Sequence, residues 1–423
     1  MPRRLKWVLR CRGTVCCLVV VALPGALIGE AKAASGYETR AKAAVLMEAS
    51  TGAVLYQHNA DQLLPPASMS KLMTLAVAFR ALKKGRINLD DQFVVSEHAW
   101  RTGGAPSGTA AMFVPINTKA SVHELIQGII VQSGNDAAIA VAEGMAGSEE
   151  AFAQRMTARA RKIGLEKSVF KNATGLNDPE HLMTARDIAL LSSYLINEFP
   201  EYYGMFAQRE FRYRKHRFFN RNPLLLTETG VDGLKTGYVK DAGYGIVASA
   251  KQGNLRLIAV VMGLPSAAMR KSEGRKLLDW GFRNVSVAKL FDANETVAYA
   301  RVWGGDRYFA PLNARGALSI YLPRTPENPR LRAEITYDSP LKAPISKGQK
   351  LATLRVASES GSMNELPLYA AEDIKESGFL ARGIDTLGFL VAEWLDEQIS
   401  TLVGLAIPDP NAVIPASESA TSR

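Results

Sequence analysis

The sequence changes character near residue 288, and this change limits the domains that the chain can form. From about residue 40 to residue 288, helical and strand patterns alternate with short turns. After that point come short β-like runs separated by Pro, Gly and Asn, which is typical of a small all-β domain. A chain of 423 residues is also long enough for two or three folded units. We therefore expect a larger domain over residues 34–288 and a small β domain over residues 289–373.

The order of elements within the larger domain predicts its architecture. Residues 42–61 have the pattern of two strands around a turn, and residues 67–84 that of an apolar helix ended by Gly85. Further helical patterns follow, and residues 243–264 then predict a hairpin before a closing helix. Strands, a helical block, a hairpin and a final helix indicate an α+β fold, in which helices pack on an antiparallel sheet.

Residues 1–33 have the features of a secretory signal peptide. A basic start precedes an apolar run too short for a good membrane-spanning helix, and a small-x-small motif ends at Ala33. We expect cleavage near Ala33 and export to the periplasm or the outer face of the cytoplasmic membrane. An uncleaved N-terminal anchor is the alternative. All three cysteines lie in this segment, so the mature protein would have neither a disulfide framework nor a thiolate metal site.

Loss of the signal peptide also changes the argument from charge. The segment carries six basic residues and one acid, so its removal lowers the net charge from +10 to about +5. The remaining chain has no recognisable aromatic and basic binding module. The sequence therefore gives no support for nucleic-acid binding.

Residues 374–407 carry an amphipathic helical pattern, with apolar side chains and Trp394 on one broad face. Acidic residues and an arginine within the pattern make a membrane span unfavourable. Two interpretations remain open. Either residues 376–404 make peripheral contact with a membrane, lying in its interface plane, or the helix packs against the β domain or a partner helix. Residues 408–423 have the composition of a disordered tail.

A serine and a lysine begin the apolar helix predicted over residues 67–84. Ser68 precedes Lys71 by three positions, so both side chains would lie on one helix face. Because burial lowers the pKa of a lysine, Lys71 would be able to take a proton from Ser68. Ser68 also lies near the helix N-terminus, where a developing negative charge is stabilised. An N-cap serine beside an ordinary lysine has the same spacing, so this motif alone decides nothing.

Two further motifs contain the residue types of an acyl-transfer site. Ser133 and Asn135 lie in a tight connection between two helices, where they could relay a proton and orient a substrate carbonyl. The tripeptide Lys-Thr-Gly at residues 235–237 comes just before the predicted hairpin. A strand there would present a lysine and a hydroxyl to an anionic substrate, with Gly237 allowing close backbone approach. Alone, these motifs are a helix linker and a strand end.

In this order the three motifs are those of penicillin-binding proteins and class A β-lactamases. The chain resembles the low-molecular-mass penicillin-binding proteins that are serine-type D-alanyl-D-alanine carboxypeptidases. The segments that carry the resemblance are VLMEASTGAVLY, PPASMSKLMT, QSGNDAAIAVAE, NRNPLL and GVDGLKTGYVKDAGYGIVASA, together with the β domain and its amphipathic helix. The resemblance implies a penicillin-binding/β-lactamase-like transpeptidase domain, an antiparallel sheet with helices on both faces, followed by a small all-β domain.

The resemblance also implies a role for each matching residue. Ser68 would be the nucleophile, Lys71 its base, and Ser133 the residue that passes protons to the leaving amine. The residues implied in substrate binding are Asn135, Arg221, Lys235, Thr236 and Gly237. The oxyanion hole would be formed by the backbone N–H groups of Ser68 and Tyr238.

The activity implied is removal of the terminal D-alanine from peptidoglycan pentapeptides through an acyl-enzyme on Ser68. β-Lactam antibiotics would be covalent inhibitors, and no cofactor is implied. His123 and Glu124 lack the second histidine of a metalloprotease motif, and the five histidines show no ligand spacing, so we expect no metal site.

Two features depart from the family pattern, and rival activities remain. Tyr238 stands where many relatives have histidine, and the loop over residues 100–113 has no clear counterpart.

A class A β-lactamase needs a further glutamate for deacylation, and Glu180 lacks that family's spacing. A D,D-endopeptidase that cuts peptidoglycan cross-links would use the same residues as a carboxypeptidase. A non-catalytic wall-binding scaffold would have no need for a lysine on a buried helix.

Overall fold

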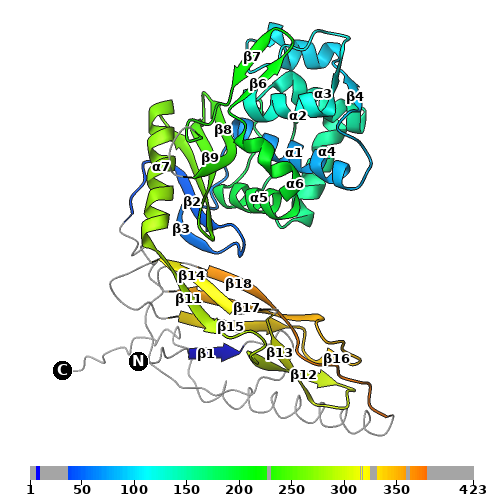
Figure 1. The fold of residues 1–423 in the computed structure, drawn as a ribbon, viewed down its shortest axis with the longest axis vertical. Helices are drawn as coiled ribbons and strands as arrows, with labels where there is room; N and C mark the ends of the chain where they lie inside the picture. Colours follow the sequence, from blue (N-terminus) through cyan, green and yellow to red (C-terminus); the bar gives the residue numbers. More distant parts are fainter. Residues whose placement is uncertain are drawn as a thin grey trace, which may run out of the picture.

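The computed structural model describes residues 6–9, 37–225, 230–314, 316, 318–323, 331–358 and 363–378. Figure 1 shows two folded parts joined at one end, an upper part of helices around a sheet and a lower part built of strands. The predicted α+β domain with a separate small β domain is confirmed by this arrangement.

A central antiparallel sheet organises the larger part. Its strands follow the order β3-β2-β10-β9-β8. All six residues of β2 are buried, because helices cover the sheet on both faces. The bounds of these strands are β2 Ala43–Glu48, β3 Val54–His58, β8 Val231–Val239, β9 Gly243–Gln252 and β10 Leu255–Leu264.

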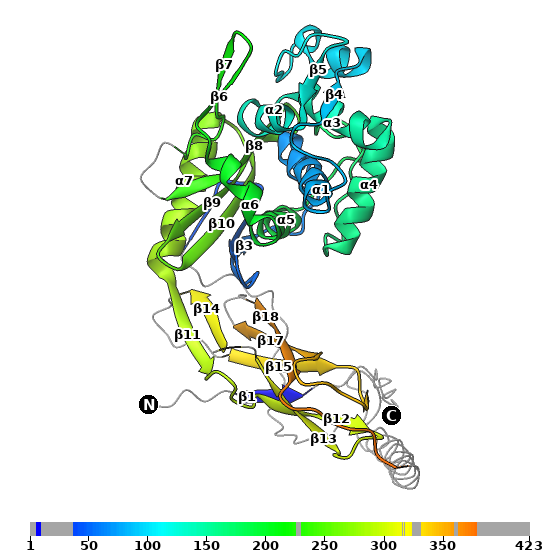
Figure 2. The same ribbon diagram turned by 45° about the vertical axis from the view of Figure 1, so that its right-hand side comes forward.

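Helices lie on both faces of this sheet, as Figure 2 shows from the side. α7 contacts β9 and β10 on one face, and α5 contacts β2 and β10 on the other, with α1 packed against α5 and α4. The bounds of the helices are α1 Lys71–Lys83, α2 Val122–Gln127, α3 Asn135–Ala146, α4 Glu149–Lys162, α5 Ala185–Glu198, α6 Pro200–Tyr203 and α7 Ala267–Asn284. Two small hairpins complete this part: β4 Gln92–Val94 with β5 Lys119–Ser121, and β6 Glu210–Tyr213 with β7 His216–Phe219.

Apolar side chains fill the space on each side of the sheet. Phe79 of α1 lies 5.9 Å, ring centre to ring centre, from Phe199 and 6.3 Å from Phe206 in the core beneath the helical block. Leu277 and Leu278 of α7 belong to a second cluster on the opposite face. Burial on both faces removes most of the sheet from water, which makes it a rigid support for residues at its edge strand β8.

The smaller part is a set of strands that begins where α7 ends. β11 starts at Val285, directly after Asn284. β11 pairs with β14 in a separate two-stranded sheet, whereas the sheet that contains β15, β17 and β18 continues the sheet of the larger part through a single residue pair, Met363 of β18 with Val54 of β3. The bounds are β11 Val285–Phe291, β12 Ala298–Trp303, β13 Phe309–Asn313, β14 Leu318–Pro323, β15 Leu331–Tyr337, β16 Leu341–Lys342, β17 Lys350–Ser358 and β18 Met363–Ala370.

The two ends of the chain are described only in part. The predicted signal peptide is represented by β1, Lys6–Leu9, which pairs in parallel with β15. The first residues of the predicted amphipathic helix are extended rather than helical, because Ile374 pairs with Ile345 and Glu376 with Gly305. The rest of that helix and the tail over residues 408–423 lie outside the described residues. Within the part of the chain that the structure describes, no helix is both long and apolar enough to cross a membrane.

Candidate active site

The predicted serine and lysine lie at the start of α1. Ser68 belongs to a short 3-10 turn, Ala67–Ser70, and Lys71 is the first residue of the α-helix that follows. The helix predicted from residue 67 therefore begins with a tighter turn, which Ala67 enters at a φ of 50°. Ser68 is half-buried and Lys71 is fully buried. The turn presents the serine hydroxyl at the surface of the core while the lysine amine lies beneath it.

The amine of Lys71 makes three contacts. Nζ lies 3.0 Å from Oγ of Ser68 and 2.6 Å from Oδ1 of Asn135, and it also donates to the carbonyl oxygen of Thr174. Burial, followed by the charge of Arg221, lowers the pKa of Lys71 to about 7. Near neutral pH a substantial share of this amine is uncharged, as a general base requires.

Ser133 and Asn135 lie beside Lys71, in the connection before α3. Ser133 has a left-handed φ of 65°, which turns the chain between a helical turn over Gly128–Gln132 and the first residue of α3. Its Oγ is buried and has no hydrogen-bond partner among the described residues. Nδ2 of Asn135 donates to Oγ1 of Thr109 across 2.9 Å. The serine hydroxyl is thus available to a ligand, whereas the asparagine amide is held from both ends.

The Lys-Thr-Gly motif lies on the edge strand β8, as the sequence indicates. Lys235 and Thr236 are buried, and burial lowers the pKa of Lys235 well below its ordinary value, with Lys71 and Arg221 adding repulsion. A Cβ atom on Gly237 would lie 2.7 Å from the carbonyl oxygen of Pro66. Glycine is therefore needed for β8 to approach the turn that carries Ser68.

Arg221 and Tyr238 lie at the rim of the same site. Arg221 is exposed, and its charge is close enough to lower the pKa of both buried lysines. Its backbone N–H donates to the carbonyl oxygen of Val131 across 3.3 Å, next to the Ser133 turn. The side chain of Tyr238 is 53% exposed, and its ring lies 4.3 Å from that of Tyr244, centre to centre. Every residue predicted from the sequence motifs therefore belongs to one region around α1, α3 and β8.

Four residues that the sequence analysis did not identify support this region. The carboxylate of Asp136 accepts hydrogen bonds from the backbone N–H groups of Met112 and Val114, which ties the loop over residues 100–113 to α3. Thr109 in that loop contacts Asn135, and Thr174 contacts Lys71 through its carbonyl oxygen. The fourth is Glu149 of α4. The loop over residues 100–113, which has no clear counterpart in the family pattern, therefore contacts the site directly.

Glu149 lies behind the loop that carries Thr174. Its Oε1 accepts a hydrogen bond from the backbone N–H of Ala173 across 2.9 Å, and its Oε2 lies 2.9 Å from Nε2 of His98. The negative charge of Glu149 raises the pKa of Lys71, against the larger effect of burial. Among the described residues there is no cluster of three histidine, cysteine or carboxylate side chains that could hold a metal ion.

Comparison with known proteins gives the same result over most of the chain. The family model for D-alanyl-D-alanine carboxypeptidase matches residues 30–266, and the model for the C-terminal domain of penicillin-binding protein 5 matches residues 286–376. D-alanyl-D-alanine carboxypeptidase DacC of Escherichia coli strain K12 is 40% identical over 363 residues, which make up 85% of this chain and 90% of that protein.

Solved structures agree with these sequence matches. Penicillin-binding protein 5 from Haemophilus influenzae is 36% identical and has a TM-score of 0.69 over 80% of this chain and 99% of that one. Penicillin-binding protein D2 from Listeria monocytogenes, in an ampicillin-bound form, is 29% identical and has a TM-score of 0.52 over 58% of this chain and 98% of that one. The resemblance found in the sequence is confirmed, and the chain belongs to the D-alanyl-D-alanine carboxypeptidase family of serine peptidases.

Proposed function

We propose that this enzyme removes the terminal D-alanine from peptidoglycan pentapeptides through an acyl-enzyme on Ser68. Lys71 takes the hydroxyl proton as Oγ of Ser68 attacks the carbonyl carbon of the penultimate D-alanine. The peptide C–N bond then breaks, and the terminal D-alanine leaves with a proton that reaches its nitrogen through Ser133. Water hydrolyses the resulting ester and restores the serine hydroxyl.

The contacts of Lys71 carry this proposal. Two of its three partners, Oδ1 of Asn135 and the carbonyl oxygen of Thr174, only accept hydrogen bonds. A neutral amine has two N–H bonds, which these two acceptors use. The lone pair is then directed towards the third partner, Oγ of Ser68, 3.0 Å away. This arrangement supports Lys71 as the base and Ser68 as the nucleophile.

The positive charges around Ser68 support recognition of an anionic substrate end. Lys235 and Arg221 repel Lys71 and one another, and a bound carboxylate would relieve that repulsion. Thr236 adds a hydroxyl donor on the same strand. We assign the terminal carboxylate of the peptide to these residues, with Asn135 holding the peptide amide.

The close approach of β8 to the Ala67–Ser70 turn supports an oxyanion hole formed by backbone groups. Gly237 allows β8 to contact Pro66, so the strand and the turn that carry the N–H groups of Tyr238 and Ser68 lie side by side. Two N–H groups directed at one point would stabilise the negative oxygen that develops during attack. Since only the backbone of Tyr238 is used, a tyrosine can replace histidine there.

β-Lactam antibiotics are proposed as covalent inhibitors, because penicillin-binding protein D2 of similar fold has an ampicillin-bound form. The basic and apolar N-terminal segment supports export, and with it a place in the periplasm or on the outer face of the cytoplasmic membrane. Peripheral membrane contact through residues 376–404 rests on the amphipathic sequence pattern alone, since residues beyond 378 lie outside the described part.

The first experiment is intact mass spectrometry of the mature protein after brief incubation with benzylpenicillin. We expect a covalent adduct in the wild type and none in Ser68→Ala. Release of D-alanine from a peptide ending in D-Ala-D-Ala should be lost in the same variant. Rapid hydrolysis of the drug without a lasting adduct would instead identify a β-lactamase. Absence of both adduct and hydrolysis would leave only a non-catalytic, wall-binding role.

Cleavage of a cross-linked muropeptide, compared with cleavage of the pentapeptide, distinguishes a D,D-endopeptidase from a carboxypeptidase. The cross-linked substrate has no free terminal D-alanine at the scissile bond, so its cleavage requires room beyond the carboxylate-binding residues. We expect faster turnover of the pentapeptide, because Arg221 and Lys235 provide charge for a terminal carboxylate. A higher kcat/KM for the cross-linked substrate would reverse this assignment.

A further inference from the structure

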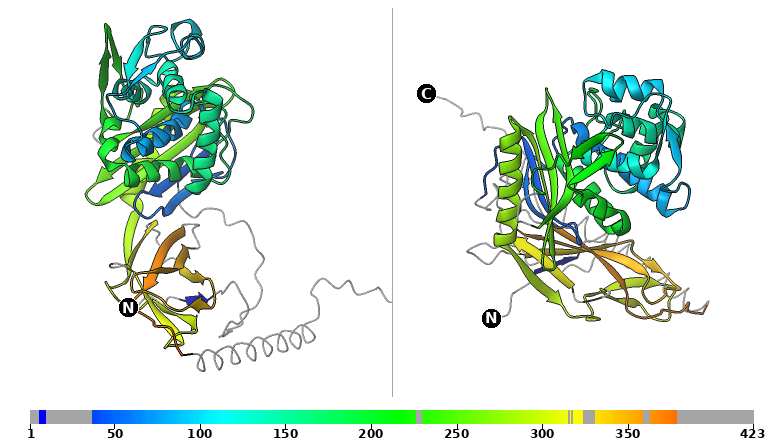
Figure 3. Two further views of the ribbon diagram at one scale, coloured as in Figure 1. Left: turned by 90° about the vertical axis from the view of Figure 1, so that its right-hand side faces the viewer. Right: turned by 45° about the horizontal axis from the view of Figure 1, so that its top comes forward.

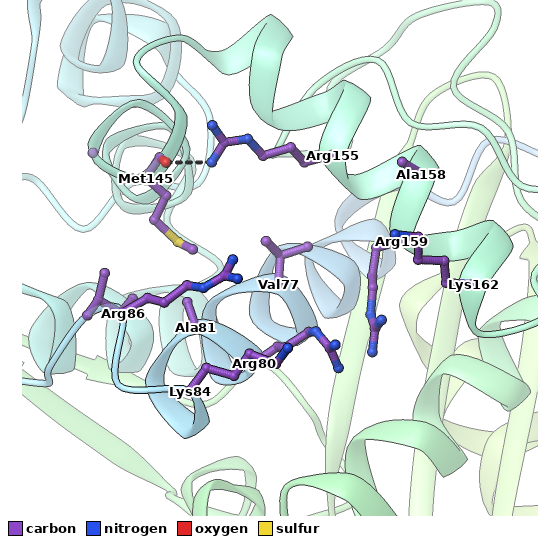
Figure 4. Close-up of a pocket in the computed structure, with 12 residues that line it drawn as sticks. Val77, Arg80, Ala81, Lys84, Arg86, Met145, Arg155, Ala158, Arg159 and Lys162 are labelled. Carbon is purple, nitrogen blue, oxygen red and sulfur yellow. Dashed lines mark hydrogen bonds between the residues drawn. The ribbon is translucent and has the colours of Figure 1, made fainter.

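A cavity of about 600 Å³ lies at the opposite end of α1 from Ser68. Figure 4 shows it bounded by the C-terminal half of α1, the turn that follows, the end of α3, and α4. Its apolar floor includes Val77, Ala81 and Met145. Arg80 lies nine residues after Lys71, or about 14 Å along the helix axis at 1.5 Å per residue. The cavity is therefore separate from the catalytic groups.

The charged residues that line this cavity all have the same sign. They are Arg80, Lys84, Arg86, Arg155, Arg159 and Lys162, and no aspartate or glutamate is among the lining residues. They come from two helices and a turn that are separate in the sequence, and Figure 4 shows Arg80, Arg86 and Arg155 around the same space. We call these six side chains the basic cluster.

The basic cluster is not neutralised by the protein. Arg155 donates to the carbonyl oxygen of Met145 across 2.7 Å, and Arg159 donates to the hydroxyl of Tyr194, so both partners are uncharged. Nε of Arg159 is buried and has no hydrogen-bond partner in the described part of the chain. Repulsion, first from Arg80, lowers the pKa of Lys84. No member of the cluster forms an ion pair with any residue that the structure describes.

Helix dipoles explain part of this arrangement but not all of it. Arg80 lies in the last turn of α1, and Arg159 and Lys162 in the last turn of α4, where cations offset the negative end of a helix. Arg86 lies beyond the end of α1, and Arg155 lies in the middle of α4. Arg155 nevertheless gains from the dipole of α3, because it donates to the carbonyl oxygen of Met145 in the last turn of that helix. Helix ends therefore account for single cations, but not for the convergence of six cations on one cavity whose lining contains no acidic residue.

We propose that this cavity binds a compact ligand that carries two or more phosphate groups. A volume of about 600 Å³ suits a small molecule. The six cations of the basic cluster are best balanced by a ligand with several negative charges close together. A diphosphate carries more negative charge in a small volume than a single carboxylate does. Four of the six cations are arginines, whose planar groups form paired hydrogen bonds with phosphate oxygens. The apolar floor would contact an uncharged part of the ligand. This inference does not depend on the activity proposed for Ser68.

The test is calorimetric titration of the full chain with inorganic pyrophosphate at constant ionic strength. The double variant Lys84→Gln/Arg86→Gln removes two charges whose side chains make no hydrogen bond with described residues. Loss of two charge-assisted contacts should weaken binding about tenfold or more. The matched control, Lys251→Gln/Lys347→Gln, removes two exposed charges elsewhere and should bind pyrophosphate like the wild type. Both variants should form the benzylpenicillin adduct normally.

A second measurement identifies the source of the phosphate. Sedimentation with vesicles of anionic phospholipid compares the wild type with Lys84→Gln/Arg86→Gln, with and without pyrophosphate. Loss of the variant's vesicle binding, and competition by pyrophosphate in the wild type, would indicate a lipid headgroup. Equal vesicle binding together with weakened pyrophosphate binding would indicate a soluble ligand. Equal affinity for pyrophosphate in wild type, variant and control, or no binding at all, would overturn the proposal.

Discussion

Nζ of Lys71 donates to Oδ1 of Asn135 across 2.6 Å, and this contact joins the first residues of two helices, α1 and α3. The amine is therefore close to the N-terminal ends of both helices, where helix dipoles disfavour a positive charge. This effect acts in the same direction as burial. A lysine amine in this position is fixed in space and uncharged at a lower pH than a lysine in water.

The rate of acylation should depend on the protonation of Lys71. The pKa of this residue is about 7, and only the neutral amine can accept the Ser68 proton. The second-order rate of benzylpenicillin acylation should therefore rise about tenfold per pH unit below pH 7 and level off above it. Stopped-flow measurement between pH 5 and 9 tests this. Lys71→Arg, which stays charged, should be slower by about a thousandfold; a flat profile in the wild type would contradict the assignment.

The same pKa predicts how stability changes with pH. In the unfolded chain Lys71 has the ordinary value of 10.5, so between pH 7 and 10.5 the unfolded state binds the extra proton. The stability of the wild type should therefore rise with pH across this window, relative to Lys71→Met, which has no such group. The expected change is on the order of a few kcal/mol. Urea unfolding of both proteins at pH 7.5 and 9.5 measures it, and a constant difference between them would argue against a lowered pKa.

Glu149 should tune the base without touching the substrate. Its charge raises the pKa of Lys71, so Glu149→Gln should lower that pKa and move the midpoint of the acylation profile to lower pH. The glutamine oxygen can still accept from the N–H of Ala173, which preserves the loop. Glu150→Gln, at the exposed neighbouring position, should leave the profile unchanged. A purely structural role for Glu149 would lower the rate at every pH without moving the midpoint.

Gly175 should tolerate no side chain. A Cβ atom there would lie 2.0 Å from the carbonyl oxygen of Ala67 and 2.5 Å from Oγ of Ser70, at a φ of +75°. Gly175→Ala should therefore displace the turn that carries Ser68, destabilising the protein by about 2 kcal/mol or more and slowing acylation. Gly164→Ala has a similar φ of +84° with nothing within 4 Å, so it should lose only about 1 kcal/mol through backbone strain. Equal unfolding free energies for the two variants would rule out the steric argument.

Asp136 should hold the loop beside the active site. Asp136→Ala would leave the N–H groups of Met112 and Val114 without their acceptor, which should destabilise the protein by about 2–4 kcal/mol. Acylation should also slow, because Thr109 in the same loop positions Asn135. Asp90→Ala, at an exposed position, is the control and should behave like the wild type. Urea unfolding and the benzylpenicillin assay test both effects, and wild-type stability in Asp136→Ala would disprove the role.

The sequence was sufficient to predict the side chains that the structure brings together around α1, α3 and β8. Ser68 and Lys71 have a helical spacing, and Lys235 lies on a strand that the following hairpin pattern identifies. These spacings can be recognised in the sequence because the geometry of a single helix or strand decides which nearby side chains lie on the same face. The contact of α1 with α3 through Asn135 is not local, and it was inferred from the resemblance of the whole motif set to a known family.

The supporting residues left weaker signals. Thr174 acts through a carbonyl oxygen that any residue would supply, so its identity is uninformative. Asp136 and Glu149 lie in the first turns of ordinary helices, where acidic residues are common. Only their burial distinguishes them, and burial depends on tertiary packing. Gly175, whose positive φ requires glycine, was the one sequence feature that could have drawn attention to this loop.

The junction between the two domains has a consequence for where the enzyme works. α7 passes into β11 without an intervening residue, and Val54 pairs with Met363 across the same boundary. Figure 3 shows the region where the two parts join from two further directions. A joint without a linker restricts rotation of the β domain more than a flexible linker would. The β domain thus acts as a spacer between its own far end and the domain that carries Ser68. A surface that held this far end would therefore restrict the height at which Ser68 meets a substrate.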